Sequence, residues 1–235
     1  MIEEISLLGL LLGLLPAAVV IGIMFRWSAG GATAVYATGR MLIQLLLIGY
    51  VLVYIFEAER AAIIGAVLIV MLVIASWIAI RPVANKHAHV FRNALIAISI
   101  GGILILALVT QVVIAVDPWF NPRYVVPLAG MVFAGAMNSV SLAAERFESE
   151  TGRDVPVSEA RRIALSAALI PIINSLFAVG VVALPGMMTG QILSGISPLI
   201  AAKYQIVVMS MLFGVSGISA ALYLQLQTRT LQSSH

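Results

Sequence analysis

The sequence predicts an all-α membrane protein with about seven transmembrane helices. Three observations support this fold class: the composition, the length of the apolar runs and the placement of the basic residues. Of the 235 residues, 62% are hydrophobic and only 10% are charged, whereas soluble domains are about 45–50% apolar and about 25% charged. A globule of this size still needs a large polar surface, so the excess of apolar residues indicates that lipid is the solvent.

The apolar residues fall into runs of roughly the 20 residues that a helix needs to cross the hydrocarbon core. We expect one transmembrane domain over residues 1–235, with spans at about 5–25, 41–56, 61–80, 93–116, 124–145, 163–184 and 204–226. The first span follows the acidic start MIEEIS. Secretory signals begin with basic residues instead, so we expect this span to be retained.

The later spans differ in how continuous their apolar runs are. The second has a more polar lead-in from residue 33, while the third, fourth and seventh are strongly apolar. The fifth contains Pro127 and the sixth contains Pro171. A proline removes one helical N–H and can free a carbonyl. Such freed backbone is tolerated at membrane depth only where it is buried or lines a cavity.

The lysines and arginines predict the orientation, because cytoplasmic loops carry an excess of them. With the N-terminus outside, ten of the thirteen fall on the cytoplasmic side: Arg26, Arg40, Arg81, Lys86, Arg92, Arg146, Arg153, Arg161, Arg162 and Arg229. The remaining three, Arg60, Arg123 and Lys203, fall outside. The sequence therefore predicts an N-out, C-in topology in the inner (plasma) membrane.

Polar groups inside the spans are the first candidates for function, since they tend to face a bundle interior or a water-filled path. No Asp, Glu, Lys or His lies deep in a predicted span, which favours an energy source outside this chain. Asn138, Ser141 and Asn174 are candidates for a transport path. The alternative for each asparagine is a hydrogen bond that joins two helices, worth about 1 kcal/mol.

The stretch LPGMMTGQILSG, residues 184–195, lies between the last two spans and faces outward in this topology. We interpret it as part of an outward gate that continues the path. The candidate residues are Met187, Met188, Thr189 and Gln191. Thioethers prefer soft metals such as Cu(I), but methionine is also a common gap-filler. The alternative is a packing seam of small residues, because Gly186 and Gly190 form a GxxxG.

The longest charged segment, ERFESETGRDVPVSEARR at 145–162, lies on the cytoplasmic side. Ser158 could cap a helix that starts at Glu159. We interpret this segment as a docking surface for a soluble partner, and a solvated loop is the alternative. Its candidate residues are Glu145, Arg146, Glu159, Arg161 and Arg162.

Composition also limits the other classes of function. The chain has no cysteine, so no disulfide framework, zinc–thiolate site or cysteine nucleophile is available. The basic residues stand beside the spans, which favours a membrane role and no nucleic-acid partner. His87 and His89 could bind a metal in an extended segment, but a basic juxtamembrane loop is the commoner meaning. We expect no cofactor.

Three stretches resemble the FetB-like iron-export permease family, which also includes plant aluminium-tolerance permeases. They are PLAGMVFAGAMNSVSLAAERF (127–147), ALIPIINS (168–175) and LPGMMTGQILSGISPLIAAKYQIVVM (184–209). Arg40 and Gln44 match the RxxxQL-like start of the second span. The resemblance extends over nearly the whole chain. It departs from the family pattern before the sixth span, where VPVSEARRIALSAALIP replaces a longer segment.

The resemblance implies the permease subunit of an ABC-type exporter, for iron or another metal ion. A separate cytoplasmic ATPase would power it, and two copies of each subunit would form the exporter. No GxxxxGK[ST] motif occurs here, which agrees with ATP hydrolysis on another chain, so we expect no enzyme activity. The alternatives are a secondary carrier of a small polar solute, a non-transporting membrane scaffold, or a retinal protein. A retinal protein requires a lysine within the seventh span and a carboxylate in the third, and this sequence has neither there.

Overall fold

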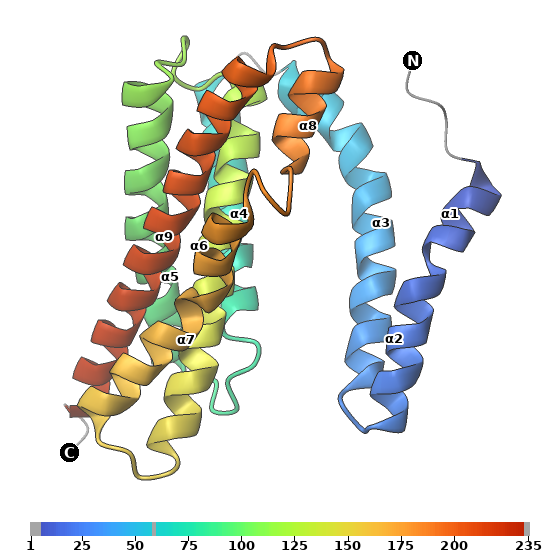
Figure 1. The fold of residues 1–235 in the computed structure, drawn as a ribbon. Helices are drawn as coiled ribbons and strands as arrows, with labels where there is room; N and C mark the ends of the chain where they lie inside the picture. The colour runs from blue at the N-terminus through green and yellow to red at the C-terminus, as the bar shows by residue number, and fades with distance from the viewer. Residues whose placement is uncertain (1–5, 58–59, 233–235) are drawn as a thin grey trace. The chain divides into compact units, whose positions relative to one another are not determined.

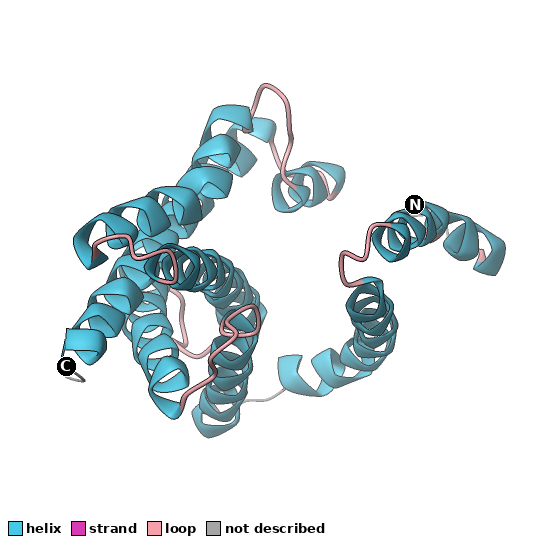
Figure 2. Ribbon diagram, turned by 90° about the horizontal axis from the view of Figure 1, so that it is seen from below, coloured by secondary structure: helices cyan, strands magenta, loops and turns pink. Residues whose placement is uncertain are grey.

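The computed structural model describes residues 6–57 and 60–232. These residues fall into two compact units, one that ends at Glu57 and one that follows it. The described residues contain helices and no strand, apart from one isolated bridge between Val179 and Ala183 (Figure 2). Within residues 6–57 and 60–232, seven helical segments are long and apolar enough to cross a membrane, so the prediction of an all-α protein with about seven transmembrane helices is confirmed. The single permease domain stays a prediction.

The first unit contains α1 (Leu7–Gly13), α2 (Leu15–Arg26) and α3 (Gly31–Phe56) (Figure 1). The predicted first span is thus two helices, since Pro16 in the first turn of α2 cannot donate to the preceding turn. The third helix begins at Gly31, ahead of the predicted 41, because the lead-in GATAVYATGR contains no proline and several alanines. Gly30, with φ of +79°, makes the turn that separates α2 from α3.

The second unit is built around two long helices. Its elements are α4 (Ala61–Ala79), α5 (Ala88–Ala107), η1 (Leu108–Val113), α6 (Pro122–Thr151), α7 (Val157–Ala178), α8 (Gly186–Leu193) and α9 (Pro198–Gln232). The first long helix, α6, packs against α4, α5, α7 and α9, and the second, α9, packs against α5, α6, α7 and α8 (Figure 1). These two helices therefore position most of the residues discussed below.

Small residues let α6 sit at the centre of this unit. Ala129, Ala136 and Ala143 recur every seven residues along it, and all three are fully buried. A Cβ atom at position 102 of α5 would lie only 2.9 Å from the ring of Phe133. Because Gly102 has no side chain, the ring of Phe133 can pack directly against α5 there. Helices in membranes associate through such close contacts, because lipid supplies no hydrophobic drive between them.

The charged segment 145–162 is a helical hairpin with a short turn, whereas the sequence interpretation treats it as a loop. The helix of the fifth span, α6, continues to Thr151, since residues 145–151 are mostly good helix formers and Arg146 pairs with Glu150 at 2.7 Å. The helix of the sixth span, α7, begins at Val157 behind Pro156. Pro156 occupies the N-cap position, so Ser158 lies inside the helix and does not cap it.

The two ends of the second unit differ in how many Lys and Arg residues they carry. We call the basic end the one formed by the loop 80–87, the turn 152–156 and the last described turn of α9. It carries Arg81, Lys86, Arg92, Arg146, Arg153, Arg161, Arg162 and Arg229. The opposite end carries Arg60, Arg123 and Lys203. The fold therefore gathers at one end the bases that the topology prediction assigns to one side of the membrane.

Candidate functional site

A polar groove runs between α6, α7 and α9, near the middle of α6 and α9. Its volume is about 350 Å³. The polar side chains that line it are Asn138, Ser139, Ser175 and Ser216. Small neighbours in α6, including Gly135, leave the space that a larger side chain would fill. The groove thus presents one amide and three hydroxyls among otherwise mainly apolar residues.

The sixth span contains a proline beside this groove and leaves the helical form after Ala178. Pro171 lacks the N–H that would bond to the carbonyl of Ala167. The hydroxyl of Ser175 donates to the Pro171 carbonyl at 2.9 Å. After α7 ends at Ala178, residues 179–185 form an irregular turn that includes Gly180 with φ of +81°. The chain becomes helical again only at α8, so non-helical backbone joins the helices α7 and α8.

A second pocket, of about 360 Å³, opens at this interruption. It is lined by residues of α7, the irregular turn, α8 and α9, including Gly180, Met188, Gln205, Met209 and Ser210. Gln205 is only 6% exposed, and its side-chain oxygen has no hydrogen-bond partner in the structure. A buried acceptor without a partner is costly. Gln205 therefore brings a buried amide with an unused acceptor to the lining of this pocket.

The structure places the sequence-predicted path residues in different surroundings. Asn138 lines the groove, while Asn174 is exposed on α7 and is not among the groove residues. Ser141 is half-buried one turn further along α6 and does not line the groove either. The structure thus joins Asn138 with Ser175 and not with Asn174.

The stretch 184–195 is largely the helix α8, although the sequence interpretation treats it as a glycine-punctuated loop. Met187 packs against the buried core, whereas Met188 lines the second pocket. The hydroxyl of Thr189 donates to the Pro185 carbonyl at 3.2 Å and so serves its own helix. Gln191 has a buried side-chain oxygen with no partner. Of the four predicted gate residues, Met188 reaches the pocket, and Gln191 retains an unused acceptor.

Sequence reasoning missed Gln205 and Ser216, which lie on α9. Both lie within the last apolar run, where the candidate path residues were not sought. A search for amides within the last span would have found Gln205 in the string YQIVVM. Met209 follows Gln205 by four residues, and this spacing places both side chains on the same face of a helix.

The predicted docking residues all lie at the basic end, but most already have partners within the chain. Arg162 and Glu159 form an exposed ion pair at 2.6 Å. Arg161 donates to the side chain of Gln225 at 2.8 Å, and Arg146 pairs with the buried Glu150 at 2.7 Å. Glu145 is exposed on α6. The hairpin therefore presents a mixed-charge surface whose side chains are largely held in place.

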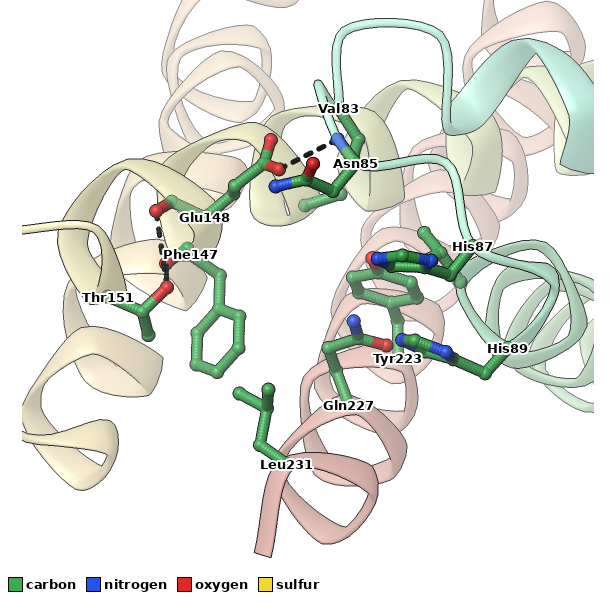
Figure 3. A pocket seen from close by; sticks show the side chains of 12 residues that line it. Val83, Asn85, His87, His89, Phe147, Glu148, Thr151, Tyr223, Gln227 and Leu231 are labelled. Carbon is green, nitrogen blue, oxygen red and sulfur yellow. Dashed lines mark hydrogen bonds between the residues drawn. The ribbon is translucent and has the colours of Figure 1, made fainter. Parts of the chain in front are cut away.

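A third pocket, of about 300 Å³, lies at the basic end (Figure 3). The Glu148 carboxylate accepts from the backbone N–H groups of Ala84 and Asn85, at 2.8 and 3.1 Å. Across the pocket, the rings of His87 and His89 stack with their centroids 5.3 Å apart. Within the described residues, no three His, Cys, Asp or Glu side chains gather where they could hold a metal ion. The structure thus ties the loop 80–87 to the end of α6.

Comparison with known proteins identifies the family. The model described as uncharacterised protein family UPF0014 matches residues 5–155 and 153–232. A UPF0014 membrane protein of Synechocystis is 33% identical over 229 residues, which are 90% of this chain and 87% of the relative. No solved structure matches the chain.

Two further relatives have names that state a role. The probable iron export permease protein FetB of Escherichia coli is 32% identical over 214 residues, 85% of this chain and 81% of the relative. The protein ALUMINUM SENSITIVE 3 of Arabidopsis thaliana is 32% identical over 207 residues, 79% of this chain and 72% of the relative. The resemblance that the sequence motifs indicate is thereby confirmed, and the chain belongs to the UPF0014 family of membrane proteins.

Proposed function

We propose that this chain is the permease subunit of an ABC-type exporter that moves a metal ion out of the cytoplasm. Iron is the first candidate, because a relative that matches most of the chain is named a probable iron export permease. A separate cytoplasmic ATPase would supply the energy, two permease chains would assemble in the inner (plasma) membrane, and this chain would perform no covalent chemistry.

The interrupted sixth span is the observation that carries the proposal. Non-helical backbone within a membrane bundle is stable only where it is buried or lines a cavity. Transporters place their binding sites at such broken helices. Here the break at 179–185 contributes Val179 and Gly180 to the second pocket, which holds amide, hydroxyl and thioether groups. A scaffold without transport function would need neither the break nor the buried, unpartnered side-chain oxygen of Gln205.

The charge distribution supports the proposed topology. Most bases of the second unit lie at the basic end, which we assign to the cytoplasm on the rule that cytoplasmic loops are enriched in Lys and Arg. The partner ATPase would then meet the hairpin between α6 and α7. Glu145, Arg146, Glu159, Arg161 and Arg162 are the proposed contacts.

The first test is what binds to the full chain. A tagged chain is expressed in its own cells, solubilised and purified, and we expect a nucleotide-binding subunit to co-purify in equal amount. Replacing Arg161 and Arg162 by alanine should reduce its recovery. Replacing Arg153, which lies on the same hairpin and is not a proposed contact, is the matched control. Full recovery of the subunit with the double variant would show that docking lies elsewhere.

The second test separates an ABC exporter from a carrier. Proteoliposomes that contain the purified complex should accumulate iron only with ATP, and Asn138→Ala should slow the uptake. Uptake that needs no ATP and stops when the proton gradient is collapsed would favour a secondary carrier. Absence of any uptake of iron, manganese, copper or aluminium would favour a scaffold.

A further inference from the structure

The second pocket brings together two methionines that are distant in sequence. Met188 lines it from α8 and Met209 lines it from α9. Gln205 lies one helical turn before Met209 on the same face of α9, and it lines the same pocket. The methionine pair that is adjacent in sequence does not form this arrangement, because Met187 packs against the core. The structure thus replaces a sequential pair of thioethers by a pair that spans two helices.

Gln205 brings a buried polar side chain to the lining of this pocket. The residue is only 6% exposed, and its side-chain oxygen has no partner. An apolar ligand would leave this oxygen unsatisfied, whereas a hydrogen-bond donor or a cation would satisfy it. The other lining groups near it are mostly apolar, including Ile206 and Ala202.

The available donors favour one class of cation. Thioether sulfurs are soft ligands that select Cu(I), whereas hard divalent cations require several oxygen ligands. All three side-chain donors are uncharged, so the charge of a bound cation would not be neutralised there. The cost of moving an ion into a medium of low dielectric grows with the square of its charge, so a divalent ion suffers about four times the penalty of a monovalent one.

We propose that Met188, Met209 and Gln205 form a binding site for a soft monovalent cation of the Cu(I) class. The proposal goes beyond the proposed function, since it names a site for a soft cation and does not require that this ion be the one exported. The site lies where α7, the irregular turn, α8 and α9 meet, so occupancy would fix α7 and α8 relative to α9. Binding itself needs neither ATP nor a partner chain.

The experiment uses Ag(I), a soft monovalent ion that is stable in air, with the purified full chain in detergent micelles. Equilibrium dialysis is carried out with excess free methionine, which removes silver from isolated surface thioethers. We expect one silver ion to be retained per chain. Met188→Leu and Met209→Leu should each weaken retention at least about tenfold, since removing a direct ligand should cost no less than removing a supporting group. Met71→Leu, in α4 and outside the pocket, should bind as the unchanged chain does.

A second measurement on the unchanged sequence does not depend on whether the variants fold. With ¹³C-labelled methionine methyl groups, Ag(I) should shift the signals of Met188 and Met209 and leave that of Met71 in place. Excess Mg²⁺ should not reverse these shifts. Equal retention by both leucine variants, or shifts spread over all methionines, would overturn the site. ATP-driven transport is not measured here, so a negative result would leave the proposed exporter function to its own tests.

Discussion

Replacing Glu148 by glutamine tests how the basic end is held together. The carboxylate accepts two backbone N–H groups of the loop 80–87, from Ala84 and Asn85. Glutamine keeps one acceptor oxygen but turns an NH₂ group toward the other donor. A hydrogen bond to a charged group contributes about 1.5–3 kcal/mol. Because this site is partly exposed, we expect a loss of about 1.5 kcal/mol, which is roughly a tenfold change in local opening.

Hydrogen exchange of the full chain in micelles measures this change directly. The amides of Ala84 and Asn85 should exchange roughly tenfold faster in Glu148→Gln, and those within α5 should be unaffected. Glu145→Gln, one turn earlier on α6, is the matched control. If the two amides keep their protection, the Glu148 contacts do not hold the loop. If protection falls throughout the second unit, the effect is global and the local reasoning is wrong.

Two further predictions concern packing and topology. Asn93 donates to the side-chain oxygen of the buried Gln227 at 2.8 Å. Asn93→Ala should therefore lower the free energy of unfolding by about 1 kcal/mol, which is measured as a lower Tm. Adding Gln227→Ala should lower it little further, and fully additive losses of stability would show that the pair is not coupled. The chain has no cysteine, so Arg153→Cys and Leu193→Cys can be labelled singly on intact cells with a membrane-impermeant maleimide. Only Leu193→Cys should react, and labelling of Arg153→Cys from outside would reverse the proposed orientation.

Much of the fold is readable from the sequence because lipid imposes simple rules. A run of about 20 apolar residues must form a helix, since no other local structure satisfies its backbone in hydrocarbon. The third span illustrates this, as predicted 61–80 and observed Ala61–Ala79 nearly coincide. Helix ends were less readable where charged residues continue a helix beyond the apolar run, as at 146–151 of α6. There the helix is maintained by residue preference and by the Arg146–Glu150 pair.

The site was only partly readable, because its residues come from separate helices. Periodicity shows which face of one helix is polar, but not which faces meet. Asn138 was found because an amide in a span is rare. Its groove partner Ser216 gave no signal, since a lone serine fits the bundle equally well as a packing residue. The split between Met187 and Met188 follows from the helical form of α8, which turns consecutive side chains by about 100°.

The shape of α7 suggests how events at the basic end could reach both pockets. Its buried residues are Ala160, Ala164 and Ala168, spaced by four in the half of α7 that starts at the basic end. Beyond Pro171 the helix has no buried residue before it ends at Ala178. The alanine seam therefore fixes one half of α7, while the other half, next to the interruption, has few packing contacts and belongs to the less stable part of the unit.

Pro171 stands at the junction of these two halves, so we expect it to act as the hinge. Pro171→Ala restores the N–H to the carbonyl of Ala167 and removes a strain of about 3 kcal/mol that proline imposes inside a helix. The variant should keep or raise its Tm and should lose most of its ATP-driven transport, because the half of α7 that borders the pockets can no longer bend independently. Pro127→Ala is the matched control, since the carbonyl it would engage lies in the first turn of α6, where no hinge is proposed. A Pro171→Ala chain that transports at the full rate would show that transport needs no hinge at Pro171, and that the docking hairpin communicates with the pockets by another element.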